Sequence, residues 1–162
     1  MSHEPNTLPD GYKMTELGPL PAHWQVVRLG EVVSLDRGVS WSKADESRSG
    51  IEVISIPDIL GDGRVSPFPR VRISRAISQD KLLQEGDILL VGSSGSVHNL
   101  GRMGIVRDWK GQITFASFTV RARAVGAKLS KTFLAWLLQS SWVPFALFSK
   151  RAADGKYNLQ LQ

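Results

Sequence analysis

Gly86-Asp87-Ile88-Leu89-Leu90-Val91 is the stretch of sequence that decides the fold, because it joins a turn signal to an unbroken apolar run. Glycine next to aspartate favours a turn. The four apolar residues that follow show no alternation of polar and apolar side chains, which is typical of a strand buried on both faces. The sequence therefore predicts a central strand over residues 88–91.

Two further strands are expected before this run. Trp24–Leu29 is short and β-branched and ends in a turn at Gly30, and Ile51–Ile56 has the same character and stops at Pro57. Upstream of both, residues 1–22 hold four prolines and few large apolar groups, so they are expected to form an extended lead-in. Folding is expected to start near Trp24.

Three strands are expected after the central run. Met103–Val106 and Gln112–Phe115 flank residues 109–111, whose lysine and glycine indicate a hairpin turn. In Phe118–Val125 the side chains alternate, which puts the two arginines of this segment on one face of the strand.

The tail changes to a helical pattern. Ser130 can cap a helix whose apolar stripe runs over Phe133–Leu138, and Ser141 and Pro144 restart a second helix that extends through Phe148. The fold class is therefore α+β, with a twisted β-rich body of mixed and antiparallel strands followed by a C-terminal helical hairpin. Residues 23–153 are expected to form a single domain, divided into the body (23–127) and the hairpin (128–153).

Charge is distributed unevenly along the chain. The net charge is +5, but residues 1–100 carry 10 Lys and Arg against 13 Asp and Glu, whereas residues 101–162 carry 10 against 2. A basic half favours a polyanionic partner, because phosphates neutralised by Lys or Arg release condensed counterions. The alternative is an ordinary basic surface that keeps a protein in solution.

Signals for catalysis or membrane insertion are not found in the sequence. Cysteine is absent, the three histidines are scattered, and the sequence contains no Gly-x-Ser-x-Gly, His-Glu-x-x-His or Gly-x-Gly-x-x-Gly motif. Asp58 and Asp108 are the residue types of a magnesium-dependent nuclease, but about fifty residues separate them. We therefore expect no metal site and no enzyme, and the start of the chain predicts neither a secretory signal nor a membrane anchor, which favours a cytoplasmic protein.

Two loops combine glycine with polar and basic side chains. Gly92–Arg102 offers hydroxyls, an amide and a guanidinium that can reach phosphates or base edges, and Asp36–Lys43 places two cations around Trp41. The alternatives are an ordinary surface loop in the first case and a tryptophan packed into the core in the second.

The order of several motifs resembles the target recognition domain of a type I restriction-modification specificity subunit. The motifs, in chain order, are Leu20-Pro21-x-x-Trp24, Val27-x-Leu29-Gly30-Glu31, Arg37-Gly38-Val39-Ser40, Val53-Ile54-Ser55-Ile56-x-Asp58-Ile59, Leu83-x-x-Gly86-Asp87-Ile88-Leu89-Leu90, Ser93-x-Gly95-Ser96, Phe133–Leu138 and Gly155-Lys156-Tyr157-Asn158-Leu159. The resemblance covers residues 20–162. It implies a DNA methylase specificity-domain fold that recognises double-stranded DNA without catalysis or a cofactor of its own. Its partners would be DNA methyltransferase (modification) subunits, which methylate adenine, and a restriction/translocase subunit.

Complete specificity subunits hold two such domains separated by long helices, so the resemblance also implies that residues 154–162 begin the connection to a helix missing from this sequence. Recognition residues in the family vary with the target, so the DNA-binding residues are expected from loop chemistry and charge instead. They are Arg37, Ser40, Trp41, Lys43, Ser94, His98, Asn99, Arg102, Lys150, Arg151, Lys156 and Tyr157. The competing hypothesis is a protein-docking module that presents the apolar surface of the predicted helical hairpin, 133–148, to another subunit.

Overall fold

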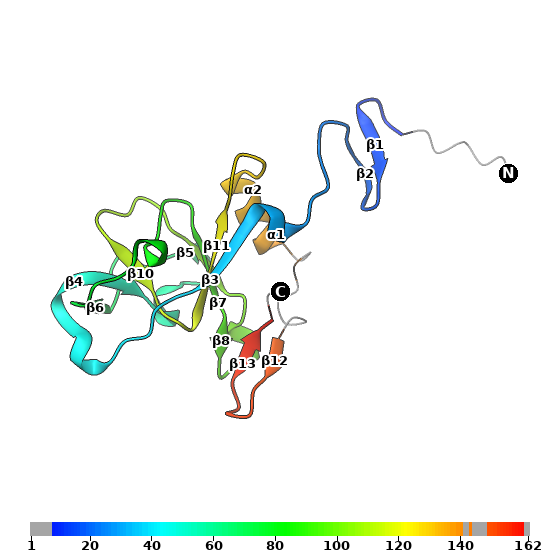
Figure 1. Ribbon diagram of the computed structural model, residues 1–162. Coiled ribbons are helices and arrows are strands. Elements are labelled where there is room, and N and C mark those ends of the chain that lie inside the picture. The colour runs from blue at the N-terminus through cyan, green and yellow to red at the C-terminus, as the bar shows by residue number, and fades with distance from the viewer. Residues whose placement is uncertain (1–7, 141–142, 144–148, 161–162) are drawn as a thin grey trace. The chain divides into compact units, whose positions relative to one another are not determined.

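The computed structural model describes residues 8–140, 143 and 149–160 and divides the chain into two units, residues 1–32 and 33–162 (Figure 1). The first unit contains an antiparallel pair, β1 (Tyr12–Thr15) and β2 (Gly18–Pro21), and a short helix α1 (Leu29–Val32). The hydroxyl of Thr15 closes the turn of the pair by donating to the carbonyl of Gly18 at 2.7 Å. Sequence reasoning missed this pair, because its prolines indicated only an extended segment.

The strand predicted over Trp24–Leu29 is wrong. Residues 24–28 have no regular secondary structure, Leu29 begins α1, and the strand starts later, at Val33. The amide of Trp24 donates to the carbonyl of Pro21, so the run begins as the continuation of a turn. β-branched residues form a strand only where a neighbouring strand accepts their backbone, and that position is taken by the residues that follow.

The centre of the second unit is a five-stranded sheet with the order β3-β11-β7-β9-β5. Its strands are β3 (Val33–Arg37), β11 (Thr119–Ala124), β7 (Ile88–Val91), β9 (Met103–Ile105) and β5 (Gly63–Arg64), all antiparallel except the parallel pair of β5 and β9. The central strand β7 is buried along its whole length, at 1% exposure or less. The prediction from the apolar run at 88–91 is therefore confirmed.

A three-stranded sheet packs against this one. It consists of β10 (Ile113–Phe115), β4 (Glu46–Ile54) and β6 (Val71–Ile73), with β10 parallel to β4 and β6 antiparallel to it. Leu89 and Val91 of β7 share one apolar cluster with Ile54 of β4 and with Ile113 and Phe115 of β10. The cluster between the two sheets is thus a core of the second unit.

The hairpin predicted from Met103–Val106 and Gln112–Phe115 is wrong. Both segments form strands, but β9 pairs with β7 and β5, whereas β10 pairs with β4. The turn residues therefore connect two sheets. The large side chains of β10 are buried between the sheets, and this burial outweighs the local turn signal.

Helix α2 (Lys131–Gln139) begins after Ser130, whose hydroxyl accepts from the amide of Phe133 at 3.5 Å, as the sequence predicts. The helix contacts β11 and buries Leu134, Ala135 and Leu138. The second predicted helix, from Ser141 through Phe148, lies outside the described residues apart from Val143. Residues 149–151 form a strand, β12 (Ser149–Arg151).

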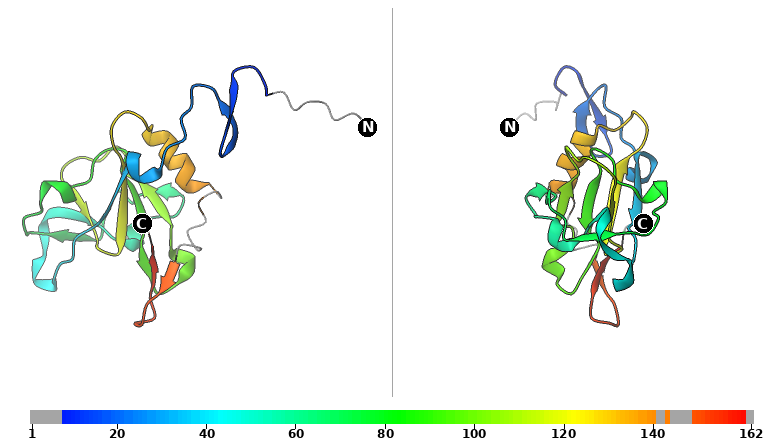
Figure 2. Two further views of the ribbon diagram at one scale, coloured as in Figure 1. Left: turned by 45° about the vertical axis from the view of Figure 1, so that its right-hand side comes forward. Right: turned by 90° about the vertical axis from the view of Figure 1, so that its left-hand side faces the viewer.

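The remaining elements are short. Strand β12 pairs with β13 (Tyr157–Leu159), which pairs in turn with β8 (Ser93–Ser94), and Figure 2 shows that β12 and β13 project beyond the five-stranded sheet. The described residues also include four 3-10 turns, η1 (Lys43–Asp45), η2 (Ile56–Asp58), η3 (Gln79–Lys81) and η4 (Val97–Asn99). The α+β, strand-rich class is confirmed. No helix in the described part of the chain is long and apolar enough to span a membrane.

Candidate nucleic-acid interface

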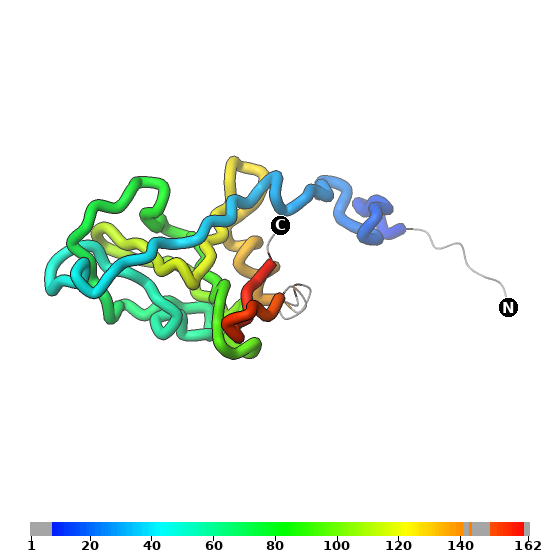
Figure 3. The backbone as a smooth tube through the Cα atoms, turned by 60° about the horizontal axis from the view of Figure 1, so that its bottom comes forward, coloured from blue at the N-terminus to red at the C-terminus, as the bar shows by residue number. Residues whose placement is uncertain are grey.

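Two of the three predicted contact segments lie in one small sheet. Strand β13 is hydrogen-bonded on one side to β12 and on the other to β8, with Tyr157 opposite both Arg151 and Ser94. The amide of Leu159 also donates to the carbonyl of Gly92 at 2.9 Å. The loop that starts at Gly92 therefore lies beside the hairpin of β12 and β13, as Figure 3 shows for the bright green and red segments.

Three cations are exposed on this hairpin. Lys150 and Arg151 are on β12 and Lys156 precedes β13. The guanidinium of Arg151 lies 5.8 Å from the ring centre of Tyr157, and the ammonium of Lys156 lies 5.6 Å from the ring centre of Phe118. The two aromatic rings thus support basic side chains at the surface.

Asp154 forms an ion pair with one of these cations. Its carboxylate lies 3.1 Å from the ammonium of Lys156, and the pKa of Asp154 is lowered first by the backbone amide of Lys156 and then by the Lys156 side chain. The carboxylate is therefore charged at neutral pH and reduces the positive potential at the tip of the hairpin.

The loop after β8 holds polar side chains next to the hairpin. The hydroxyl of Ser94 accepts from the amide of Ser96 at 3.2 Å and from the side-chain amide of Asn99 at 3.3 Å. Asn99 ends η4, and His98 within the same turn is exposed. Ser94 and Asn99 are therefore placed relative to each other before any ligand binds.

Arg102, at the end of this loop, is directed differently. Its terminal Nη2 donates to the carbonyl of Ile56 at 3.3 Å and to the carbonyl of Ile59. The guanidinium is therefore engaged by the protein's own backbone, and the structure does not group it with the cations of the hairpin.

The third predicted segment, residues 37–43, is held partly by the core. Trp41 is half-buried, packs against the cluster of Val53, Ile73 and Ala116, and donates its indole N–H to Glu46 at 3.3 Å. Core packing, the alternative to a stacking role, thus accounts for much of this side chain. Lys43 is exposed and its ammonium lies 2.8 Å from the same Glu46, whose hydrogen bond raises the pKa of Lys43.

Arg37 and Ser40, the other two expected contact residues of this segment, are exposed, and their backbone carbonyls accept hydrogen bonds. The carbonyl of Arg37 accepts from Lys81 at 3.1 Å, and that of Ser40 accepts from Arg75 at 3.0 Å. Arg75 was not among the expected contact residues. Its long-range contact with Ser40 could not be read from a stretch in which it is one of several arginines.

Residues 116–118 connect the segment of residues 37–43 to the loop that starts at Gly92. On one side Val39 forms an isolated bridge with Ala116 and accepts from the amide of Ser117 at 2.9 Å. On the other side the carbonyl of Phe118 accepts from the amides of Gly92 and Ser93 at 2.9 and 3.0 Å. Phe118 itself was missed as a site residue, because its aromatic ring in an apolar strand pattern indicated core, whereas it is exposed beneath Lys156.

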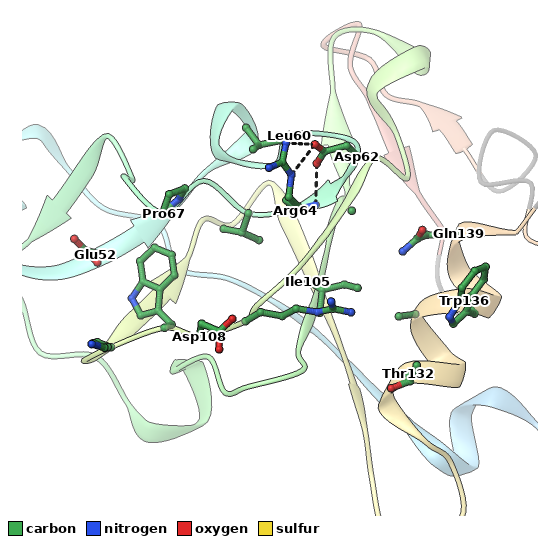
Figure 4. A pocket seen from close by; sticks show the side chains of 16 residues that line it. Glu52, Leu60, Asp62, Arg64, Pro67, Ile105, Asp108, Thr132, Trp136 and Gln139 are labelled. Carbon is green, nitrogen blue, oxygen red and sulfur yellow. Dashed lines mark hydrogen bonds and ion pairs between the residues drawn. The ribbon is translucent and has the colours of Figure 1, made fainter.

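A separate cavity of about 830 Å³ contains none of the twelve expected residues. Strands β5 and β9, the segment after β9 and helix α2 surround it, and Figure 4 shows Trp136 and Thr132 on one side and Asp108 and Pro67 on another. Both signs of charge line it, including the ion pair of Asp62 and Arg64 at 2.6 Å and the exposed Arg107 and Lys110.

The two carboxylates considered for a nuclease lie in different environments. Asp58 is 1% exposed and accepts from the amide and hydroxyl of Ser55 at 2.9 and 2.6 Å, which caps η2. Asp108 is exposed and has a positive φ of 54°. Over residues 8–140, 143 and 149–160, no group of three His, Cys, Asp or Glu is arranged to hold a metal ion.

Comparison with known proteins gives similarity to one kind of protein. No protein-family model matches the chain. The specificity subunit of the type I restriction enzyme MjaVIII from Methanocaldococcus jannaschii is 26% identical, over 81% of this chain and 31% of that protein. The chain thus spans about a third of the length of this relative.

Solved structures of specificity subunits share the fold. The HsdS subunit from Thermoanaerobacter tengcongensis matches 81% of this chain and 30% of its own with a TM-score of 0.57 and 22% identity. The type I S subunit from M. genitalium matches 82% and 30% with a TM-score of 0.54 and 11% identity. A chain from a type I restriction-modification system, whose assembly and conformational transition that structure addresses, matches 85% and 29% with a TM-score of 0.55 and 19% identity. The resemblance expected from the motifs is confirmed.

Proposed function

We propose that this chain is a target recognition domain of a type I restriction-modification specificity subunit and that it reads a short sequence in double-stranded DNA. The observation that carries the proposal is the sheet of β12, β13 and β8, which joins the exposed cations of the hairpin to the polar loop after Ser94. Cations fix a protein on the phosphate backbone, and neighbouring polar side chains read base edges.

The side chains divide into two roles. Lys150, Arg151 and Lys156 bind phosphates, and the rings of Tyr157 and Phe118 hold two of these cations in place. In the loop, Ser94, His98 and Asn99 carry the donors and acceptors that distinguish base pairs in a groove, and an asparagine amide can pair with adenine through two hydrogen bonds. We propose Arg37, Ser40 and Lys43 as further contacts, on the segment that residues 116–118 connect to this loop.

The domain selects the DNA sequence on which the complex acts and performs no chemistry itself. Its partners are DNA methyltransferase (modification) subunits, which methylate adenine, and a restriction/translocase subunit, and the assembly works on DNA in the cytoplasm. The similarity to specificity subunits supports this assignment. No cofactor is required for recognition.

Charge reversal on the hairpin tests the DNA surface. We expect Lys150→Glu with Arg151→Glu to weaken binding of the full chain to a random-sequence duplex by at least about tenfold in 50 mM salt, and to lower the salt slope by about two. Fluorescence anisotropy over a salt series measures both. Arg107→Glu with Lys110→Glu is the matched control, because it changes the same charge in the cavity. Equal losses in the two double variants would rule out the hairpin as the DNA surface.

A second experiment separates reading from attachment. A duplex enriched by the chain from a randomised pool is compared with a scrambled duplex of the same composition. We expect Ser94→Ala with Asn99→Ala to reduce the preference for the enriched duplex by about tenfold or more while binding to the scrambled duplex is retained. A preference equal to that of the unchanged chain would remove this loop from base recognition.

A further inference from the structure

Arg102 stands out among the basic residues of the loop region because its side chain is directed into the protein. Its Nη2 donates to the carbonyls of Ile56 and Ile59, which lie 43 to 46 residues earlier in the chain. Its Nε is buried and has no hydrogen-bond partner among the described residues. A guanidinium that has given up this much hydration is poorly placed to bind a phosphate at the surface.

The turn at residues 56–61 receives this side chain. Its first part is η2, which is capped by Ser55 and the buried Asp58, and the carbonyl of Ile56 also accepts from the amide of Ile59 at 3.2 Å. The two acceptor carbonyls belong to the first residue of η2, Ile56, and to the residue that follows η2, Ile59. The guanidinium thus bridges the two ends of a turn whose capping hydrogen bonds come from outside the loop.

The stem of Arg102 packs on Gly61. A Cβ atom at Gly61 would lie 3.1 Å from Cδ and 3.2 Å from Cγ of Arg102, closer than ordinary van der Waals contact. Gly61 also has a φ of +82°, which side chains rarely adopt. The turn therefore offers a surface shaped for the methylene groups as well as acceptors for the guanidinium.

The backbone of Arg102 closes the loop at its other end. Its amide donates to the carbonyl of Asn99 in η4 at 3.2 Å, and its carbonyl accepts from the amide of Val91 of β7 at 2.8 Å. The amide of Gly101 donates back to the carbonyl of Val91 at 3.0 Å. Residue 102 thus connects three elements: the polar loop, the central strand and the turn at 56–61.

We propose that Arg102 is a positioning residue for DNA recognition: it anchors the loop of residues 93–101 on the turn at 56–61 and does not itself bind phosphate. The proposal rests on the proposed function for its consequence in DNA reading. Sequence preference depends on Arg102, because base-edge contacts require side chains held to within fractions of an ångström. The number of phosphates neutralised does not depend on it.

Two variants separate positioning from phosphate contact. Arg102→Lys keeps the charge but loses the planar group and its Nε, whereas Arg102→Gln removes the charge. We expect both to lower the preference of the full chain for the enriched over the scrambled duplex by about tenfold, with an unchanged salt slope. A phosphate contact would instead leave Arg102→Lys close to the unchanged chain and lower the slope of Arg102→Gln by about one. That second pattern would overturn the proposal.

Hydrogen exchange tests the anchor without DNA. In Arg102→Gln we expect the amides of residues 100, 101 and 102 to exchange at least about tenfold faster, while the amides of β11 keep their protection. Retained protection of the β11 amides shows that the variant is folded. Unchanged exchange at 100–102 would refute the anchor, whether or not the chain binds DNA. If the chain binds no duplex while exchange changes as expected, the anchor stands and the proposed function fails.

A glycine pair provides a check that leaves Arg102 in place. Gly61→Ala puts a methyl group against the stem of Arg102, whereas Gly126→Ala has a comparable positive φ of +68° and nothing within 4 Å of the added Cβ. Backbone strain is therefore similar in the two variants. We expect faster exchange at residues 100–102 in Gly61→Ala alone. The same increase in both variants, or in neither, would contradict the contact with Gly61 as part of the anchor.

Discussion

The guanidinium of Arg121 lies 2.5 Å from the carboxylate of Asp36, its direct cross-strand neighbour in the register of β11 and β3. Arg121 is 3% exposed, lies 5.6 Å from the ring centre of Phe115 and donates to the carbonyl of Asp80 at 2.7 Å. The neighbouring Arg123 pairs with the buried Asp87 at 2.6 Å. Part of the positive charge in the second half of the chain is thus neutralised inside the sheet.

Removing Asp36 leaves a buried cation without its counterion. We expect Asp36→Ala to lower the free energy of unfolding by about 2 to 4 kcal/mol, less than for a fully buried pair because the Asp36 side chain is 36% exposed. Urea titration measures this as a shifted midpoint with an unchanged slope. Asp62→Ala, in an exposed pair with Arg64, is the control and should shift the midpoint far less. Equal losses of stability in Asp36→Ala and Asp62→Ala would show that the burial of Arg121 does not increase the contribution of its ion pair to stability.

Gly38, in the motif Arg37-Gly38-Val39-Ser40, lies where two backbone segments approach each other closely. A Cβ atom at Gly38 would lie 2.1 Å from the carbonyl oxygen of Phe115, next to the hydrogen bond from Val39 to the same carbonyl at 2.8 Å. We expect Gly38→Ala to destabilise the protein by about 2 kcal/mol or more, because neither backbone can move cheaply. Gly95→Ala, with nothing within 4 Å, should change stability by less than about 1 kcal/mol in thermal unfolding. A Gly38→Ala variant as stable as the unchanged chain would contradict this packing.

Asp154 is expected to restrain DNA binding. Asp154→Asn keeps an oxygen that can accept from the amide of Lys156 but removes the charge that pairs with its ammonium. Binding to a random duplex in 50 mM salt should become roughly three times tighter. Weaker binding would mean that the ion pair itself shapes the DNA surface.

The same carboxylate gives the hairpin a pH dependence. The pKa of Asp154 is lowered below its ordinary value of 3.8, first by the amide and then by the ammonium of Lys156. The stabilisation is therefore fully present above the ordinary pKa and is lost as pH falls through the lowered value. Amide exchange of Lys156, corrected for the intrinsic pH effect, should show its protection fall in this acid range. Asp154→Asn should not show the change, and the same acid loss in that variant would assign it elsewhere.

Helix α2 provides a pair of large side chains in opposite environments. Leu134 is buried at 1% exposure, whereas Trp136 is 73% exposed beside the cavity. We expect Leu134→Ala to cost about 2 to 5 kcal/mol and Trp136→Ala to remain within about 0.5 kcal/mol of the unchanged chain. Urea unfolding of both variants tests this. A large loss in Trp136→Ala would require a packing partner for the indole.

The sequence predicts what depends on neighbours in the chain. The buried strand at 88–91, the strand near 118–125 and the cap at Ser130 follow from local patterns, and all three are found in the structure. The hairpin between 103–106 and 112–115 fails because strand pairing is a tertiary property: β10 finds its partner about sixty residues earlier. The motif order succeeds where single motifs are weak, since it reflects the whole fold.

The candidate site was predictable in part for the same reason. Residue types suited to DNA could be chosen by charge and hydrogen-bonding capacity, and two segments chosen in this way meet in one sheet. The direction in which a side chain points could not be predicted from the sequence. Arg102 and Lys156 have similar charge in the sequence, but one faces backbone carbonyls and the other lies exposed over an aromatic ring.

The pairing of β13 with β8 has a consequence for protein engineering. Residues 93–94 and 157–158 are neighbours in one sheet although more than sixty positions separate them, so the mid-chain loop and the terminal hairpin must match each other. A graft of residues 92–102 from a related chain would bring a loop whose supporting strand still belongs to the recipient. Chimaeras should therefore exchange residues 33–160 as a block, with the crossover placed beyond Leu159.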